Sequence, residues 1–146
     1  MRIAIGSDHR GCVMKEAAIR LLVEKGYAYR DFGCREDEVV DYPDIAVQVA
    51  EAIVRGEFDR GILICSTGIG MCIAANKVKG IRAAQVWDAF TAMRSRQHND
   101  AQICCLSAEE CKARLPAILE KFLTTEFEGG RHVARINKIK EIEEQY

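Results

Sequence analysis

One stretch decides the fold of this chain: Gly61-Ile-Leu-Ile-Cys65-Ser-Thr-Gly-Ile-Gly-Met-Cys-Ile-Ala-Ala-Asn76. Residues 62–64 form a short apolar run that is typical of a strand buried on both faces, and the strand ends at Cys65. A polar break follows, and the small apolar residues from 69 to 75 predict a helix that packs on a sheet. Free N–H groups and the positive end of a helix dipole meet where such a helix begins. The turn therefore predicts an anion-binding site beside the Cys65 thiol.

Strands and helices are expected to alternate along the rest of the chain. Short apolar runs predict further strands over residues 2–6, 27–32, 83–86 and 103–106. Apolar stripes at helical spacing predict helices over about 12–25, 43–55, 88–97, 108–123 and 131–145. This order, with no hairpin dipeptide, predicts one α/β domain over residues 1–146. We expect a three-layer sandwich with a five-stranded parallel Rossmann-like sheet plus a C-terminal helix.

Three details of this plan carry their own expectations. Ser107 and Glu110 form a capping box for the helix over 108–123, but Pro116 lies beyond its first turn and is expected to kink or split it. Residues 33–41 are expected to form a charged loop. The otherwise polar last helix carries an apolar stripe that something must cover: Val133, Ile136, Ile139 and Ile142.

Composition narrows the classes of function. The 21 basic and 22 acidic residues nearly cancel, which argues against nucleic acid or an anionic membrane as a partner and favours a small ligand. The seven cysteines are odd in number and never form a Cys-x-x-Cys pair, so neither a disulfide framework nor a zinc site is indicated. No signal-like segment or membrane-spanning run is evident. We therefore expect a cytoplasmic protein that binds no metal.

Ligands of parallel sheets bind beyond the carboxyl ends of the strands. The residues expected at that edge are Asp8, His9, Cys65 to Gly70, Trp87, Asp88 and Ser107. Cys65 is the first candidate for chemistry, as a base or a nucleophile, because a helix N-terminus favours the thiolate form. The alternative is that Cys65 is a small apolar residue at a strand end. The cysteines at 72, 104, 105 and 111 have apolar neighbours and are expected to be packing residues.

All three histidines, His9, His98 and His132, lie in polar segments. His9 is expected at the same sheet edge as Cys65, whereas His98 follows a helix and falls toward the opposite edge, so that reaching Cys65 would need another subunit. A solvated loop histidine is the alternative for each. Arg131 and Arg135 are four residues apart and would grip one phosphate from a single helix face, the alternative being that this face is only solvated.

Seven motifs together carry a resemblance to a known family. They are Gly-Ser-Asp8-His9-Arg-Gly, Asp41-Tyr42-Pro43, Gly61-Ile-Leu-Ile-Cys65-Ser-Thr67-Gly68-Ile-Gly70, Ala-Ala-Asn76-Lys77, Gly80-Ile-Arg82, Ser-Arg-Gln-His98-Asn99-Asp100 and Glu128-Gly-Gly-Arg131-His-x-x-Arg135. Over nearly its whole length the chain resembles the ribose-5-phosphate isomerase B family, which also holds allose-6-phosphate and galactose-6-phosphate isomerases. The resemblance implies a homodimer, or a dimer of dimers, with active sites built from two chains and with neither a metal nor an organic cofactor.

The resemblance also implies residue roles. Cys65 matches the proton-transfer base, and His98 matches the acid/base that opens the sugar ring. The matching substrate ligands are Asp8, His9, Asn99, Arg131, Arg135 and the loop Ser66, Thr67, Gly68, Ile69 and Gly70, which cradles the enediolate. Two positions depart from the pattern: Ser66 stands where many members have Gly, and Glu109 where many ribose-phosphate enzymes have Arg.

The function expected from these residues is aldose–ketose isomerisation of a sugar phosphate through an enediolate, with ribose 5-phosphate and ribulose 5-phosphate as the main pair. In that reaction Thr67 steadies the thiolate or the substrate hydroxyls, and Asp8 assists His98 in ring opening. Three alternatives stay open. They are an allose-6-phosphate or galactose-6-phosphate isomerase, a non-catalytic flavodoxin-like module that binds a phosphate ligand, and a phosphatase in which Cys65 is a covalent nucleophile.

Overall fold

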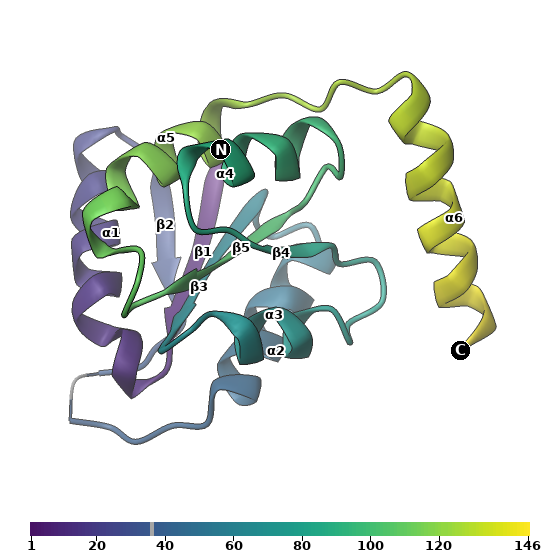
Figure 1. The fold of residues 1–146 in the computed structure, drawn as a ribbon. Helices are drawn as coiled ribbons and strands as arrows, with labels where there is room; N and C mark the ends of the chain where they lie inside the picture. Colours follow the sequence, from purple (N-terminus) through teal and green to yellow (C-terminus); the bar gives the residue numbers. More distant parts are fainter. Residues whose placement is uncertain (36) are drawn as a thin grey trace.

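The chain is built on a five-stranded, all-parallel sheet with strand order β2-β1-β3-β5-β4. A computed structural model describes residues 1–35 and 37–146 (Figure 1). The strands are β1 (Arg2–Ser7), β2 (Ala28–Asp31), β3 (Arg60–Cys65), β4 (Ala83–Gln85) and β5 (Ile103–Ser107). The α-helices are α1 (Cys12–Glu24), α2 (Tyr42–Val54), α3 (Ile69–Ala75), α4 (Ala89–Gln97), α5 (Leu115–Thr124) and α6 (Arg131–Gln145), with two short 3₁₀ helices, η1 (His9–Gly11) and η2 (Lys112–Arg114).

Successive side chains of the central strands point to opposite faces of the sheet, and this divides the core into two layers. Ile62 and Ile64 of β3 pack with α1, α4 and α5 on one face, whereas Leu63 and Cys65 pack with α2 and α3 on the other. All four side chains are at most 5% exposed, because a parallel sheet with helices on both faces buries its strands twice. The three-layer sandwich expected from the sequence is confirmed.

The strand order places a topological switch point between β1 and β3. From β1 the chain first adds β2 on one side and then adds β3 on the other, where Ser7 lies opposite Ile64. The connections on the two sides of this point run away from each other, and a crevice opens at the carboxyl ends of the two strands. Asp8 and Cys65 stand at that crevice.

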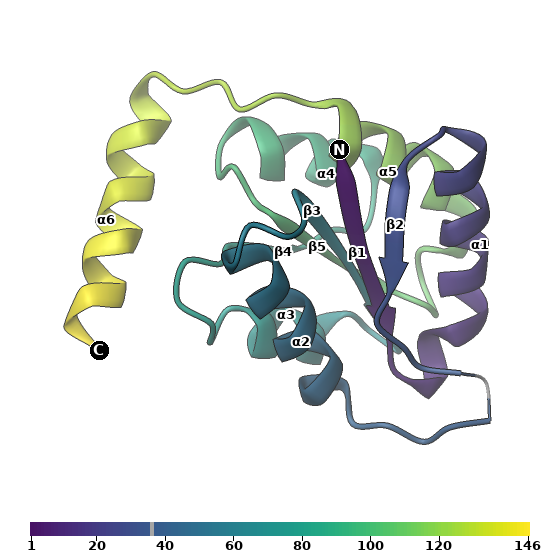
Figure 2. The same ribbon diagram turned by 180° about the vertical axis from the view of Figure 1, so that it is seen from behind.

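Helix α6 lies beyond the edge strand β4, and a long extended linker joins it to α5 (Figure 2). Near its C-terminal end Glu143 accepts a hydrogen bond from Gly80 N at 3.1 Å, and Glu144 pairs with Lys79 at 2.8 Å. Of the predicted apolar stripe, Ile136 is buried, but Val133 and Ile142 remain 44% and 56% exposed. Within one chain the stripe is therefore only partly covered.

The predicted helix over 108–123 is wrong in its first part. Glu110 N does bond to Ser107 Oγ at 3.0 Å, as the capping box predicts, but the chain then passes through η2, and α5 begins only at Leu115. Pro116 lies in the first turn of α5, where its missing N–H costs nothing and its fixed φ suits a helix start. The predicted interruption is therefore present, and Pro116 lies in the first turn of the second helical segment.

The loop predicted over 33–41 contains residue 36, which lies outside the described residues. The neighbouring residues 33–35 have no regular secondary structure, and α2 begins at Tyr42 with Pro43 in its first turn. Across the described part of the chain, none of the helices is both long and apolar enough to cross a membrane.

Candidate active site

The crevice between β1 and β3 holds the predicted thiol. Cys65 ends β3 at 5% exposure, and its Sγ accepts a hydrogen bond from Gly68 N at 3.2 Å. On the β1 side, Asp8 N bonds to Ile64 O at 3.2 Å, which ties the start of the Asp8 loop to the end of β3. The structure thus brings Cys65 and Asp8 to one sheet edge, as the sequence predicts.

Asp8 and His9 are positioned by local hydrogen bonds. One carboxylate oxygen of Asp8, Oδ1, accepts from Arg10 N at 3.0 Å and from Gly11 N at 3.1 Å, so the side chain caps η1. These two bonds fix the position of the Asp8 side chain at the crevice. The half-buried ring of His9 has its Nδ1 3.3 Å from Val40 O, a contact that joins the first loop to the approach to α2.

The loop from Ser66 to Gly70 needs its glycines. Gly68 has φ +80°, a left-handed conformation that side chains resist, and a Cβ there would press on the backbone of Leu106. A Cβ at Gly70 would collide with the Tyr42 ring. Thr67 is exposed, and its Oγ1 accepts from Ile69 N at 3.2 Å. The result is a tight loop that places a thiol, a hydroxyl and the first N–H groups of α3 side by side.

Ser66 and Glu109, the two positions at which the resemblance predicts a departure from the family pattern, contact each other. The Ser66 hydroxyl donates a hydrogen bond to Glu109 Oε1, and Glu109 N bonds to Ser66 O at 3.3 Å. Ser107 Oγ also donates to Ser66 O at 2.8 Å, so the loop after β5 supports the loop after β3. An exposed carboxylate therefore stands beside the cysteine loop.

A second cluster gathers the other predicted residues. A cavity of about 270 Å³ is lined by His98, Asn99, Arg131, His132, Arg135, Ile136 and Ile139. His98 caps the C-terminus of α4, where its N–H bonds to Arg94 O at 2.9 Å. Arg131 and Arg135 lie one turn apart at the start of α6, both with exposed side chains. The pair and His98 therefore face one small cavity.

Electrostatics favour a neutral His98. Burial away from water, and then the adjacent His132, lower the pKa of His98, with smaller effects from Arg94 and Arg131 in the same direction and an opposing effect from Glu128. A neutral imidazole carries one donor and one acceptor nitrogen, which suits a group that both takes and returns a proton.

Within one chain the two clusters lie at opposite ends of the sheet. Cys65 is paired with Ser107 at the carboxyl end of β5, whereas His98 precedes the other end of β5, where Ile103 pairs with Gly61. Four residues of strand at about 3.3 Å each separate the two ends by about 13 Å. This agrees with the sequence-based expectation that His98 falls toward the opposite edge.

Two features escaped the sequence reasoning. Glu128 and His132 join His98 in a group whose possible metal-ligating atoms all lie within 4.8 Å of one another, the one such group found among residues 1–35 and 37–146. The Glu-x-x-x-His spacing was the available signal. Cys72 packs against the core beside α2 and α3, as expected, but sequence reasoning missed its hydrogen bond with Cys105, which lowers the pKa of Cys72 to about 7.

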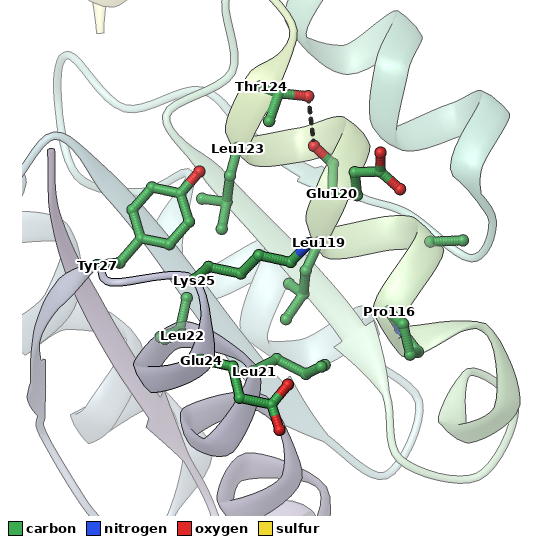
Figure 3. Close-up of a pocket in the computed structure, with 11 residues that line it drawn as sticks. Leu21, Leu22, Glu24, Lys25, Tyr27, Pro116, Leu119, Glu120, Leu123 and Thr124 are labelled. Atoms are coloured by element: carbon green, nitrogen blue, oxygen red, sulfur yellow. Dashed lines mark hydrogen bonds between the residues drawn. The ribbon is translucent and has the colours of Figure 1, made fainter.

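A larger cavity, of about 480 Å³, lies elsewhere, between the end of α1 and α5 (Figure 3). Leucines 21, 22, 119 and 123 dominate its lining. Its polar residues include Glu120, whose backbone carbonyl accepts from Thr124 Oγ1 at 2.6 Å inside the helix. None of the predicted site residues borders this cavity, so its size does not make it the candidate site.

The chain is similar to known proteins over nearly its whole length. The ribose/galactose isomerase family model matches residues 3–139. The solved ribose-5-phosphate isomerase B of Clostridium thermocellum is 48% identical, with a TM-score of 0.98 over 100% of this chain and 99% of that one. The Mycoplasma genitalium ribose-5-phosphate isomerase B, solved with bound ribulose 5-phosphate, is 42% identical with a TM-score of 0.92, covering 99% and 97%.

A relative with another named substrate is equally similar in sequence. The D-erythrulose-4-phosphate isomerase of Pectobacterium atrosepticum is 42% identical over 99% of this chain and 97% of its own length. The family model covers most of the chain, and these likenesses extend over nearly all of it. The chain belongs to the ribose/galactose isomerase family.

Proposed function

We propose that this protein is an aldose–ketose isomerase that interconverts ribose 5-phosphate and ribulose 5-phosphate through an enediolate. The observation that carries the proposal is the Cys65 thiol, held 3.2 Å from Gly68 N at the switch point of the sheet. The names of the two solved relatives support the reaction class and the substrate.

The first step opens the sugar ring. Neutral His98 accepts the proton of the anomeric hydroxyl and delivers a proton to the ring oxygen, which leaves an open-chain aldehyde. The lowered pKa of His98 supports this role, because the imidazole is then unprotonated and ready to accept near pH 7. Asn99, next in the chain and on the same cavity, is proposed to bind a sugar hydroxyl, and Asp8 to assist the ring opening.

The second step moves one proton between two carbons. The Cys65 thiolate takes the proton from C2, and the electron pair shifts to the carbonyl oxygen O1. The hydroxyl proton of O2 then passes to O1, and the Cys65 thiol, whose proton can exchange with solvent at this stage, returns a proton to C1 as the C2 carbonyl forms. Backbone N–H groups of the loop from Ser66 to Gly70 stabilise the enediolate oxygen, and Thr67 binds a substrate hydroxyl or steadies the thiolate. His9 completes the substrate contacts from the β1 side. The reaction is redox-neutral overall, so the proposal includes no cofactor.

The phosphate would be bound by Arg131 and Arg135, whose exposed guanidinium groups face the His98 cavity. Because about 13 Å of strand separates that cavity from the Cys65 loop, we propose a homodimer, or a dimer of dimers, in which each site combines the Cys65 loop of one chain with His98 and the arginines of another. The incompletely covered stripe on α6 supports this assembly, since Ile142 is 56% exposed. A cytoplasmic location is proposed because the mechanism needs Cys65 reduced.

Exchange of the C2 proton with solvent tests the proposal. Cys65→Ala should retain substrate binding but lose washout of C2 deuterium by about 10²–10⁴-fold, the usual cost of removing a general base. Cys72→Ala is the matched control and should keep most of the exchange. A Cys65→Ala variant that exchanges at a near wild-type rate would disprove the role of the thiol. Binding without exchange in the wild type would instead favour the non-catalytic binding module.

A second substrate class is favoured by one contact. Glu109 places a carboxylate on Ser66, beside the loop, and a carboxylate repels a phosphate held there. This favours a sugar phosphate of another length, such as allose 6-phosphate or galactose 6-phosphate. A relative named D-erythrulose-4-phosphate isomerase supports the idea that members of the family are named for different substrates. Comparison of kcat/KM across ribose 5-, allose 6-, galactose 6- and erythrulose 4-phosphates decides between them.

A further inference from the structure

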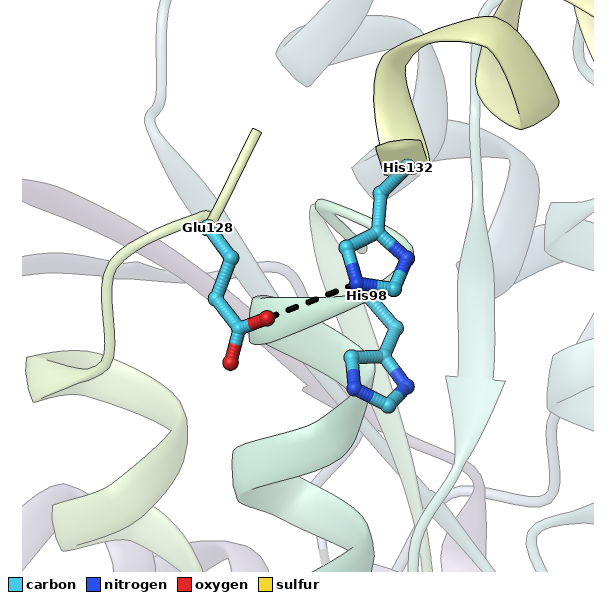
Figure 4. Close-up of side chains that lie close together, drawn as sticks. All are labelled: His98, Glu128 and His132. Carbon is cyan, nitrogen blue, oxygen red and sulfur yellow. Dashed lines mark ion pairs between the residues drawn. The ribbon is translucent and has the colours of Figure 1, made fainter. Parts of the chain in front are cut away.

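Three side chains that can ligate a metal meet where the linker to α6 crosses the end of α4 (Figure 4). His98 caps α4, Glu128 belongs to the linker, and His132 lies in the first turn of α6. A backbone hydrogen bond from Glu128 N to Gln97 O, at 3.1 Å, fixes the linker against the end of α4. This backbone bond, and not only contacts between side chains, therefore holds Glu128 and the start of α6 close to His98.

The distances within this cluster suit a small tetrahedral ion. His132 Nε2 lies 3.4 Å from Glu128 Oε2. Two ligands at 2.0–2.2 Å from a tetrahedral Zn²⁺ are themselves roughly 3.4 Å apart. The His98 ring stacks on the His132 ring, with 17° between the ring planes and centroids 4.4 Å apart, and the three ligand atoms lie within 4.8 Å of one another. Because an imidazole binds a metal in the plane of its own ring, the His98 ring must turn out of this stack to become the third ligand.

The donor set points to zinc among the common cations. Imidazole nitrogens suit Zn²⁺, whereas Mg²⁺ and Ca²⁺ favour shells made of oxygen. His132 is only 5% exposed, which limits the freedom of its ring. Glu128 supplies one negative charge, which offsets part of the repulsion of a cation by Arg94, Arg131 and Arg135 around the cluster. We propose that His98, Glu128 and His132 form a Zn²⁺ site with an open fourth position.

Such a site would regulate the enzyme. A zinc ion bound to His98 occupies the nitrogen lone pair that ring opening needs, so Zn²⁺ inhibits the isomerase reversibly, and a chelator restores activity. The inhibition rests on the proposed function, but the binding does not, because it needs only the three side chains. Isomerisation itself requires no metal, and a chelator therefore leaves the basal activity intact.

Metal binding is measured first, without any activity assay. The full-length chain is titrated with Zn²⁺ by calorimetry and with Co²⁺ by absorption spectroscopy. Glu128→Gln and His132→Gln should each weaken binding by about tenfold or more. Glu126→Gln, an exposed carboxylate two residues away, is the matched control and should bind as the wild type does. Glu128 is also exposed, so its variant folds even if His132→Gln does not.

The cysteine thiols could also bind the added metal, and the Co²⁺ titration distinguishes a thiolate site from the proposed His/Glu site. A thiolate bound to Co²⁺ produces an intense ligand-to-metal charge-transfer band, which a His/Glu site lacks. Binding that survives in Glu128→Gln and His132→Gln, or that disappears in Cys65→Ala or Cys72→Ala, would overturn the proposed site. Mg²⁺ at the same concentration should not compete with Zn²⁺.

Inhibition is then measured with ribose 5-phosphate in metal-buffered solution. The concentration of free Zn²⁺ that halves the rate should rise about tenfold or more in Glu128→Gln and stay unchanged in Glu126→Gln. Equal sensitivity of the two variants would overturn the regulatory role of the cluster. A chain that binds Zn²⁺ through the cluster but has no isomerase activity in chelator would contradict the proposed function and leave the metal site standing.

Discussion

Ser66 and Glu109, 43 residues apart in the sequence, are joined by a hydrogen bond from the Ser66 hydroxyl to the Glu109 carboxylate. A second bond, from Glu109 N to Ser66 O at 3.3 Å, makes the contact reciprocal. These are the two positions at which the sequence resemblance predicts a departure from the family pattern. The two departures therefore form one local feature at the mouth of the candidate site.

Glu109→Arg should raise kcat/KM for ribose 5-phosphate by about tenfold relative to a six-carbon sugar phosphate. The substitution removes a repelling carboxylate and adds a donor for the phosphate, and a charged hydrogen bond contributes about 1.5–3 kcal/mol. Glu110→Arg, also exposed, is the control for a general change in charge. An equal change for both substrates would remove Glu109 from substrate selection.

Cys72 should react with alkylating agents near neutral pH. The hydrogen bond with Cys105 outweighs burial and lowers the pKa of Cys72 to about 7. Thiolate is the reactive form, so the rate should rise through pH 7 and level off about one pH unit above it. Mass spectrometry of iodoacetamide-treated protein measures the rate, with Cys104, whose pKa burial raises, as the unreactive reference.

Two further experiments distinguish the reactivity of Cys72 from that of Cys65. Cys105→Ala removes the hydrogen bond and should move the pKa of Cys72 up toward its ordinary value, which slows alkylation at pH 7. Ribose 5-phosphate should protect Cys65 from alkylation and leave Cys72 unprotected, because the Cys72 thiol faces Ala83 O, 3.4 Å away. Protection of neither cysteine would argue against Cys65 as part of the substrate site.

Mixed dimers test whether the site is shared. Cys65→Ala and His98→Asn chains should each be inactive, and hybrids formed by unfolding and refolding them together should regain part of the wild-type activity. The expectation follows from the roughly 13 Å of strand between the two residues. In a statistical mixture half of the dimers are hybrids, each with one intact site, so activity should approach about a quarter of the wild type. Hybrids that form but remain inactive would place both residues in one chain's site.

An ion pair between the buried Lys15 and the partly exposed Asp31 makes a stability prediction. Lys15 is 1% exposed, and its Nζ bonds to Asp31 Oδ1 at 3.0 Å and to Cys34 O at 2.6 Å. Asp31→Ala should lower the free energy of unfolding by about 2–3 kcal/mol, because it leaves an ammonium group buried with one carbonyl partner.

Lys15→Met should cost less than about 1 kcal/mol, since the Asp31 side chain is 35% exposed and keeps its bond from Gly33 N. Urea unfolding of both variants at one fixed protein concentration measures the difference. A larger loss for Lys15→Met than for Asp31→Ala would show that packing of the lysine stem, and not its charge, dominates.

The sequence by itself determined the fold class and one half of the candidate site. The run from Ile62 to Ile64 ends at Cys65, and a strand end, its turn and the following helix are local features that residue pattern encodes. Asp8 follows β1 in the same way, and parallel strands bring their carboxyl ends to one edge. The edge on which these residues lie was therefore predictable.

Only the tertiary structure decided which distant side chains touch. Ser66 meets Glu109, Cys72 meets Cys105, and Glu128 with His132 meets His98, although each pair is separated by 30 or more residues. A local pattern records the period of burial along one element, whereas these contacts depend on strand order, on register and on where the linker crosses α4. Those are properties of the packed sheet and helices, and the free energy that selects them is spread over the whole core.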